Sequence, residues 1–234
     1  MIGRAPVSRA MQQDMEGRFI SHHMLTQAFQ DILRRQGEEV YSGRYIELRD
    51  NVTFDTPKGP KTREVIIRDT SGVIVIPIDD NGRMLFVLQY REPVGSSSLE
   101  LPGGGILAGE TPQDAAIRES AEEGGFAAIG EPRAEFLSYT APYSSTDTNY
   151  YFTLRVSATA KQEQRLDESE IIDGRVITLS VDEAVRAIRD GEITHGPTIQ
   201  GVLWYAVNHA SEERDSLDRS AKDAHRGDGL VPYG

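Results

Sequence analysis

Three glutamates lie close together near the middle of this 234-residue sequence. On a helix, Glu119 and Glu123 would occupy one face, one turn apart, with Glu122 beside them. Like charges at this spacing destabilise a helix unless something positive lies between them. Arg118 is the only cation in the helix, and no lysine occurs between Lys61 and Lys161. An acidic face solvated by water is the ordinary alternative, but the missing partners favour a hard divalent cation, which prefers oxygen ligands.

The acidic helix has local signals at both ends. Thr111 is a typical N-cap and Pro112 suits the first helical position, so we predict a helix over Pro112–Glu123. The glycine pair that follows is a typical stop signal. The run Glu92–Ser98 predicts a loop, and the run Gly103–Gly105 before the helix predicts a tight turn. It does not fit a phosphate-binding P-loop, because no Lys-Ser or Lys-Thr pair follows it.

The spacing of apolar residues predicts the elements that must position this helix. The segment Gly72–Asp79 is apolar enough to be a central strand. Strands alternating with a few helices predict an α+β fold with a mixed sheet between helices. The other strands are expected at Tyr41–Phe54, Arg63–Asp69, Arg83–Arg91, Ala134–Thr140, Thr148–Ala158 and Gly174–Ser180, and the other helices at Phe19–Arg35, Val181–Arg189 and Pro197–His209.

Composition excludes several classes of function. The formal net charge of -12 argues against non-specific binding to nucleic acid and against adhesion to an anionic membrane. The absence of cysteine excludes disulfides, thiolate nucleophiles and cysteine-based zinc sites. The apolar run Gly72–Ile78 is too short to span a bilayer, and the first residues lack the apolar core of a signal peptide. We therefore expect a cytoplasmic protein with no nucleic-acid or membrane partner.

The glycines and charges together carry a resemblance to a known family. Gly104, Glu110 and the run Arg118-Glu119-x-x-Glu122-Glu123-x-Gly125 resemble the Nudix box of the Nudix hydrolase superfamily, and all of these positions match at the right spacing. Ser120 departs from the pattern, because the family usually has an aliphatic residue there that packs the helix onto the sheet. The resemblance implies a Nudix-type α/β/α sandwich around a mixed β-sheet, with an N-terminal helix and extra N-terminal strands in this chain.

The resemblance also implies a metal-dependent hydrolysis of nucleoside diphosphates linked to another moiety. It implies two or more bound Mg²⁺ or Mn²⁺ ions. Their positive charge would let this acidic protein bind an anionic substrate that it would otherwise repel. The resemblance implies that Glu119 and Glu123 are the principal metal ligands and that Glu122 is a further ligand with a catalytic role. The Gly103 carbonyl would be a backbone ligand, and Glu110 would either support the ligands or bind an additional ion. Arg118 would orient the carboxylates.

The residues that flank the box indicate a particular branch of the superfamily. The run "VLQYREPVGSSSLELPGG" resembles the ADP-ribose pyrophosphatase and nucleotide-sugar branch. This resemblance implies hydrolysis of ADP-ribose or a related ADP-sugar to AMP and a sugar phosphate. Another nucleotide sugar, such as GDP-mannose or UDP-glucose, is the alternative substrate. A nucleotide-sensing module without catalysis is a different class of function, and the complete set of box glutamates argues against it.

Several residues outside the box are candidates for binding the substrate. Arg91 ends a strand and could grip a phosphate, although a surface arginine paired with an acid is an equal reading. Glu100 occupies a position that often faces the active site in this branch. Tyr143 could stack on a base, as could Tyr41 and Tyr45, but aromatic residues at sheet positions are more often core.

The sequence offers more than one candidate for the general base. This branch usually places a catalytic glutamate in a loop after the box, and Asp147 falls at that position. Aspartate is one methylene shorter, so a simple turn residue is an equal reading. Glu168 or Glu170 are alternative bases within an exposed acidic run. His195 lies before a predicted helix without a histidine or cysteine cluster, and we expect it to be structural.

Three regions are expected along the chain. Residues 1–40 form an N-terminal extension with one amphipathic helix, and its first 17 or so residues read as a loosely attached arm. Residues 41–210 form the Nudix domain, including N-terminal strands of the kind that exchange between subunits in this branch. We therefore expect a homodimer. Residues 211–234 read as a charged, mobile tail.

Overall fold

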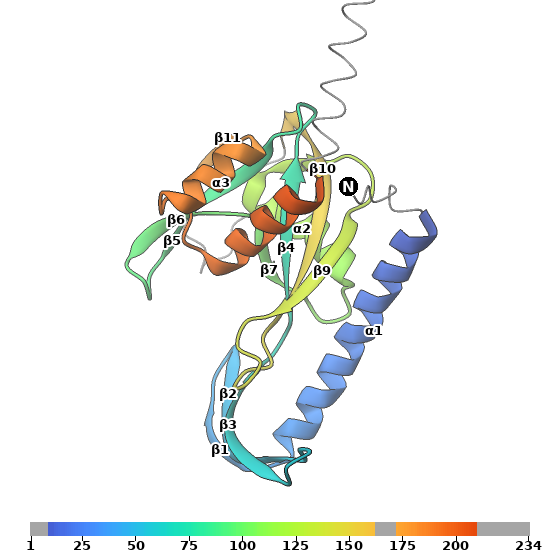
Figure 1. The fold of residues 1–234 in the computed structure, drawn as a ribbon, viewed down its shortest axis with the longest axis vertical. Helices are drawn as coiled ribbons and strands as arrows, with labels where there is room; N and C mark the ends of the chain where they lie inside the picture. Colours follow the sequence, from blue (N-terminus) through green and yellow to red (C-terminus); the bar gives the residue numbers. More distant parts are fainter. Residues whose placement is uncertain (1–8, 162–171, 210–234) are drawn as a thin grey trace, which may run out of the picture.

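The computed structural model describes residues 9–161 and 172–209, which form two β-sheets and several helices (Figure 1). The smaller sheet is antiparallel, with the strand order β1-β2-β3. The larger sheet holds the other eight strands. In chain order the elements are α1 (Arg9–Arg34), β1 (Glu38–Ser42), β2 (Ile46–Phe54), β3 (Lys61–Arg68), β4 (Gly72–Ile78), β5 (Met84–Arg91), β6 (Ser96–Glu100), β7 (Gly103–Gly105), α2 (Pro112–Gly124), β8 (Phe126–Ala128), β9 (Arg133–Tyr139), β10 (Thr148–Lys161), β11 (Ile172–Leu179), α3 (Val181–Arg189) and a last helix over residues 196–209.

The larger sheet is mixed, as expected. Strand β4 runs parallel to β10, while β5, β7, β8, β9 and β11 pair antiparallel with their neighbours. Strands β4 and β5 pair at one end only, at Ile78 and Met84. Beyond that pair they are bound to different partners, because β5 pairs with β6 and β4 pairs with β7. The chain therefore crosses from β6 to β7 just before the glycines, and this crossing positions the candidate site.

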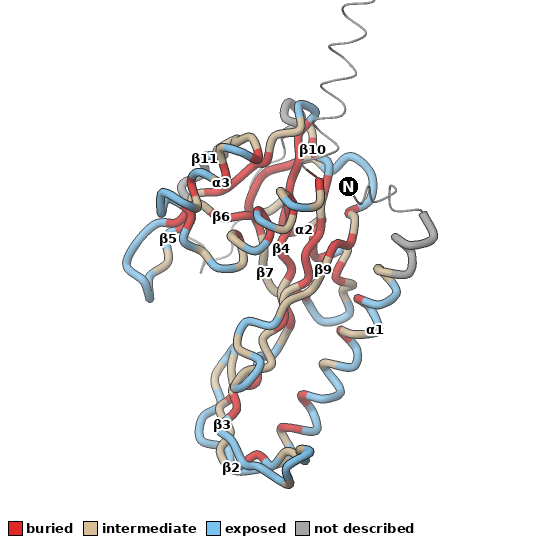
Figure 2. The backbone as a smooth tube through the Cα atoms, in the orientation of Figure 1, coloured by how far each residue is buried: buried red, intermediate tan, exposed pale blue. Residues whose placement is uncertain are grey.

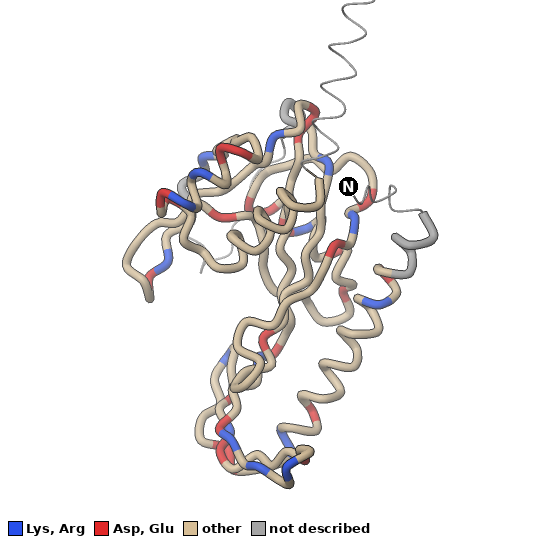
Figure 3. The backbone as a smooth tube through the Cα atoms, in the orientation of Figure 1, with Lys and Arg blue, Asp and Glu red and all other residues tan. Residues whose placement is uncertain are grey.

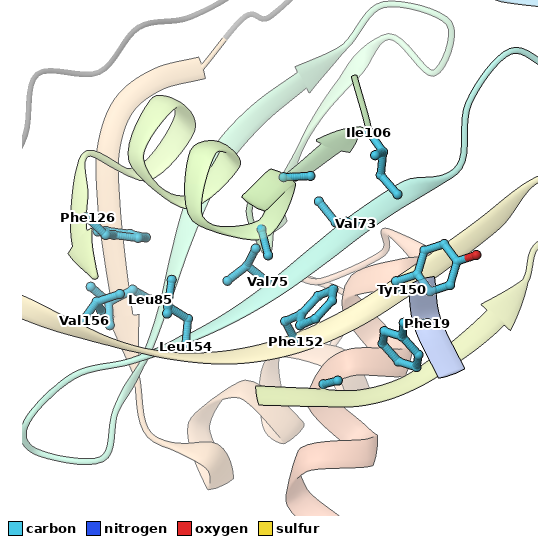
Figure 4. Packing of buried hydrophobic residues seen from close by; sticks show 13 residues of the cluster. Phe19, Val73, Val75, Leu85, Ile106, Phe126, Tyr150, Phe152, Leu154 and Val156 are labelled. Carbon is cyan, nitrogen blue, oxygen red and sulfur yellow. The ribbon is translucent and has the colours of Figure 1, made fainter. Parts of the chain in front are cut away.

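Helices cover both faces of the larger sheet, which confirms the α/β/α sandwich. Val73 and Val75 of β4 pack with α1 and α2, whereas Ile74 and Ile76 pack with α3 and the last helix. This alternation follows from the two-residue period of a strand buried on both faces. Figure 4 shows the first of these clusters, in which Phe19 of α1 lies against aromatic side chains of β10. Burial of a phenylalanine of this kind contributes about 1.5–3 kcal/mol.

The N-terminal helix is longer than the sequence predicted. Helix α1 begins at Arg9, so the reading of the first 17 residues as a loose arm is wrong for residues 9–17. Its second half leaves the main body and reaches the three-stranded sheet, which projects from the larger sheet (Figure 1). Arg34 at the end of α1 binds Glu47 and Asp69, each at 3.2 Å. Charges of both signs follow one another along this projecting region (Figure 3).

Two local predictions around the glycines are also wrong. Gly103–Gly105 is not a tight turn but the short strand β7, which pairs with Gly72, Val73 and Ile74 of β4. The serines expected in a loop belong to strand β6, which starts at Ser96. Strand β7 pairs with β4, which lies well before it in the chain, so local composition does not report that pairing, whereas β6 forms a hairpin with its neighbour β5. No helix within the two described ranges is long and apolar enough to cross a bilayer.

Candidate functional site

Helix α2 presents its glutamates to strand β7 because its ends are fixed by local chemistry. The Thr111 hydroxyl accepts a hydrogen bond from the Asp114 N–H at 3.1 Å, and Gly125 closes the helix in the left-handed conformation with φ of 63°. These caps fix where the helix begins and ends, and the fully buried Ala115 and Ala116 pack it against β4. Glu119 and Glu123 then face inward and are 4% and 3% exposed. Two carboxylates are thus buried at the junction of the helix with the glycine strand.

Glycine at β7 is what allows the two carboxylates to approach the backbone. The Gly103 N–H donates to the Glu123 carboxylate at 2.8 Å. A Cβ at Gly104 would lie 2.3 Å from a Glu119 oxygen, so either the strand or the glutamate would have to move. The structure therefore explains why this strand carries no side chains on the face toward α2. It also brings the amide of Gly103, rather than its carbonyl, into contact with a glutamate.

Arg118 binds several acidic groups at once. Its guanidinium donates to Glu110 at 2.8 and 2.9 Å, to Glu119 at 2.7 Å and to Glu122 at 3.0 Å. It also donates to the Gly105 carbonyl at 2.8 Å. A planar group with five donors can hold several oxygens in fixed directions. These bonds hold Glu110 beside Arg118 and connect the segment before α2, strand β7 and α2 itself.

These contacts shift the pKa values of the partners. Burial raises the pKa of Glu110, but the hydrogen bonds from Arg118 and from the Leu107 N–H, with the charge of Arg118, outweigh it and leave the pKa lowered. The hydrogen bond to Glu110 raises the pKa of Arg118, with further contributions from Glu119 and Glu122, against the opposing effect of burial. Glu110 and Arg118 therefore form an ionised pair at neutral pH.

The box glutamates fit a hard divalent cation by the chemistry of their donors. Carboxylate and carbonyl oxygens are the ligands that Mg²⁺ and Mn²⁺ prefer. Among the side chains that the structure describes, no three acidic or histidine residues are gathered as a ready-made metal site. Glu119 accepts from Arg118 and Glu123 accepts from the Gly103 amide, so a cation would share these carboxylates with those donors.

Arg91 and Glu100 form a second charged cluster on β5 and β6. Arg91 donates to the two Glu100 oxygens at 3.1 and 2.6 Å, and Glu100 is 1% exposed. His195 reaches the same carboxylate with its Nδ1 at 3.1 Å. Sequence reasoning missed this contact, because nothing local links the start of the last helix to the residue before the box. Arg91 pairs with an acid here, as its alternative reading expected.

The remaining candidates lie in or near the loop between β9 and β10. Asp147 is partly buried, and its N–H donates to the Ser145 hydroxyl at 3.1 Å. Tyr143 is 73% exposed. Tyr41 and Tyr45 are 55% and 57% exposed, so the expectation that they belong to a core is wrong for the chain as described. The alternative bases Glu168 and Glu170 lie outside the described residues, as does the predicted tail 211–234.

Comparisons with known proteins agree with this fold. The model of the NUDIX domain matches residues 68–202. The chain is 29% identical over 179 residues to "Methanol dehydrogenase activator" of Bacillus methanolicus, covering 76% of this chain and 94% of that one. It is 30% identical to "ADP-ribose pyrophosphatase" of Mycobacterium tuberculosis, covering 71% and 79%. The solved structure "Crystal structure of ADP compounds hydrolase" matches with a TM-score of 0.62 and 18% identity, over 76% of this chain and 93% of that one.

Proposed function

The chain belongs to the NUDIX domain family and is a Nudix hydrolase, and from this premise we propose that it hydrolyses the pyrophosphate bond of ADP-ribose or a related ADP-sugar. Water attacks one phosphorus, the P–O–P link breaks, and AMP and a sugar phosphate leave. The name of the Mycobacterium tuberculosis relative supports this choice of substrate. The observation that carries the proposal is the burial of Glu119 and Glu123 against a strand of glycines.

We propose that Mg²⁺ or Mn²⁺, as two or more ions, serves the reaction. Glu119 and Glu123 would be the principal ligands, with Glu122 and the Gly103 carbonyl as further ligands. When bound, such ions neutralise phosphate charge and acidify water. Arg118 keeps the carboxylates in fixed directions through the bonds described above, and Glu110 holds the other edge of the guanidinium.

Other residues are assigned to the substrate and to proton transfer. Asp147 is the proposed general base, and its loop lies at the start of β10, next to the central strand β4. Arg91 would bind a phosphate through its guanidinium, since its side chain is 41% exposed. Glu100 holds Arg91 in place. Tyr143, the most exposed of the candidate tyrosines, would stack on the base.

A substrate panel tests the proposed reaction. The purified chain is incubated with ADP-ribose, other ADP-sugars, GDP-mannose, UDP-glucose and nucleoside triphosphates, with Mg²⁺ or Mn²⁺, and the released nucleotides are separated by chromatography. AMP released fastest from ADP-ribose or another ADP-sugar is the expected result. Faster cleavage of GDP-mannose or UDP-glucose would move the assignment to that substrate. No turnover of any compound would contradict the enzymatic proposal and favour a sensing module.

Variants of the box glutamates test the metal assignment. Glu123→Gln and Glu119→Gln keep the size of the side chain and remove the charge, so we expect the rate to fall about a hundredfold or more. Binding of Mn²⁺ to the protein without substrate, followed by electron paramagnetic resonance, should weaken in parallel. Glu131→Gln, at an exposed glutamate outside the box, is the matched control. Normal Mn²⁺ binding by both box variants would contradict the site.

We propose that the active protein is a homodimer assembled through α1 and the three-stranded sheet. Figure 2 shows that much of the lower half of α1 is exposed. A run of large apolar side chains at a surface is typical of an interaction site. The side chains concerned are Met24 (64% exposed), Leu25 (69%), Phe29 (47%) and Ile32 (52%) on α1, and Val40 (59%) and Tyr41 (55%) on β1.

Analytical ultracentrifugation tests this assembly directly. The wild-type chain should sediment as a dimer at micromolar concentration, and Leu25→Glu should shift it toward the monomer because a charge would enter the interface. Gln27→Glu on the same helix is the matched control, since Gln27 is exposed and already polar. A wild-type monomer, or a dimer unaffected by Leu25→Glu, would contradict the proposed interface.

A further inference from the structure

The loop that carries Asp147 is bound to the N-terminal sheet. The Ile66 N–H of β3 donates to the Ser144 carbonyl at 2.8 Å, and the Ile66 carbonyl accepts from the Thr146 N–H at 3.0 Å. Ile66 and Ser145 thus form an isolated parallel bridge. The loop between β9 and β10 therefore pairs with the edge strand β3 at this one position. Its conformation therefore depends on a strand that is not part of the larger sheet.

Helix α1 reaches the same loop through a single buried amide. Gln30 is 2% exposed, and its Nε2 donates to the Thr146 hydroxyl at 3.3 Å. The same hydroxyl accepts from the Arg68 N–H at 3.0 Å. Burying an amide side chain without a hydrogen bond costs free energy of folding. The bond from Gln30 therefore helps to fix the position of the Thr146 hydroxyl. Thr146 is thereby held by both α1 and β3.

These contacts fix the backbone on either side of Asp147. Thr146 precedes it directly, and the Asp147 N–H donates to the Ser145 hydroxyl. On the other strand, the Thr140 N–H donates to the Asp147 carbonyl at 3.1 Å. The direction of a short side chain such as aspartate follows from its backbone. A shift of Thr146 would therefore move the Asp147 carboxylate with it.

We propose that Gln30 is a positioning residue for hydrolysis, which acts through Thr146 on Asp147. The inference rests on the proposed function, in which Asp147 serves as the general base. It gives helix α1 a role in the reaction, although α1 lies wholly outside the residues that match the NUDIX domain. Positioning matters because an error of about 1 Å at a reacting group can cost about a hundredfold in rate.

Two pairs of variants test the contact. Gln30→Ala should lower kcat about tenfold and leave KM within about twofold, because the substrate contacts are kept while the base is displaced. Gln27→Ala is the matched control on the same helix, with an exposed amide, and should keep wild-type rates. Thr146→Val removes the acceptor and should repeat the loss, whereas Thr146→Ser keeps the hydroxyl and should retain the rate. Thermal unfolding of each variant verifies that it is folded.

A double-mutant cycle separates positioning from general damage. In an Asp147→Asn background, Gln30→Ala should cause no further loss, because the group on which it acts is already removed. A further tenfold loss in that background would overturn the inference. So would equal rates for Gln30→Ala and Gln27→Ala in an active wild-type enzyme. If the wild-type chain hydrolyses no substrate at all, the proposed function fails instead. If Gln30→Ala does not fold, Thr146→Val against Thr146→Ser decides, and equal rates for that pair would overturn the inference.

Discussion

The Nδ1 atom of His195 lies 3.1 Å from a carboxylate oxygen of Glu100. This contact joins the start of the last helix to the residue three positions before the glycine strand. The last helix makes a second contact with the same segment, because the Thr198 hydroxyl accepts a hydrogen bond from the N–H of Leu101, the residue after Glu100, at 2.9 Å. Burial lowers the pKa of His195 and the nearby charge of Arg91 lowers it further, against the opposing charge of Glu100. His195 is therefore neutral at pH 7, and Arg91 supplies the positive charge that Glu100 needs.

Replacing Arg91 should therefore destabilise the fold. Arg91→Ala leaves a carboxylate that is 2% exposed without its cation, and we expect a loss of about 2–3 kcal/mol in the free energy of unfolding, measured in urea. Glu100→Gln in the same background should recover part of the loss, because a neutral amide needs no counter-charge. Arg155→Ala is the control, since its pair with Asp80 is exposed on both sides and spans 3.6 Å. Equal losses for Arg91→Ala and Arg155→Ala would contradict this account.

The glycine strand gives a second prediction. Gly104→Ala places a Cβ about where the Glu119 carboxylate lies, so either the strand or the glutamate must move. We expect Mn²⁺ affinity and hydrolysis to fall together by about tenfold or more, since the displaced group is an assigned ligand. Gly17→Ala is the matched control. No atom lies within 4 Å of its new Cβ, and alanine in a helix should stabilise the chain by about 0.5–1 kcal/mol. Unchanged Mn²⁺ affinity in Gly104→Ala would contradict the assignment.

The parts of the site that the sequence predicted are those set by local chemistry. Helix α2 was placed within one residue because Thr111, Pro112 and Gly125 act on their own turn of backbone. The central position of β4 followed from its unbroken apolar run. The glycine strand was read as a turn because its pairing with β4 is not local.

The contacts that join distant segments could not be predicted in the same way. His195 reaches Glu100, and Gln30 reaches Thr146, only after the sheet and the helices have assembled. A lone histidine or glutamine has no spacing signal of its own. The predicted start of α1, at Phe19, lies ten residues after its actual start at Arg9, because the first residues of the helix lack a helical spacing of apolar side chains.

Ser120, the position that departs from the Nudix pattern, gives a third prediction. It is completely buried on α2, and its hydroxyl has no hydrogen-bond partner among the described residues. A buried hydroxyl without a partner costs about 1–3 kcal/mol, so Ser120→Ala should raise the free energy of unfolding by about 1 kcal/mol without loss of activity. Ser138→Ala is the contrasting variant, because the Ser138 hydroxyl donates to Gln200 at 2.8 Å, and it should be neutral or destabilising. A destabilised Ser120→Ala would show that the hydroxyl is satisfied in solution.

Two neighbouring histidines on α1 give a prediction for pH. Burial lowers the pKa of both His22 and His23 from 6.5, and the charge of His22 lowers that of His23 further. His22 bonds the hydroxyls of Tyr150 and Tyr139 at 2.8 and 2.9 Å, whereas the Nδ1 of the buried His23 has no partner among the described residues. Below pH 6.5 the unfolded chain therefore binds more protons than the folded one, and stability falls as the pH drops until the folded pKa values are passed.

Melting temperatures measured between pH 7.5 and 5 test this sign. The wild-type melting temperature should fall across that range, before the loss below pH 4.5 that protonation of Glu110 adds through its own lowered pKa. His23→Phe should flatten the fall, because the side chain lies edge-on to Tyr150 at 6.0 Å in an aromatic setting and would no longer take up a proton. Ser21→Ala, at an exposed position of the same helix, should follow the wild-type curve. A slope unchanged by His23→Phe would assign the pH dependence to other groups.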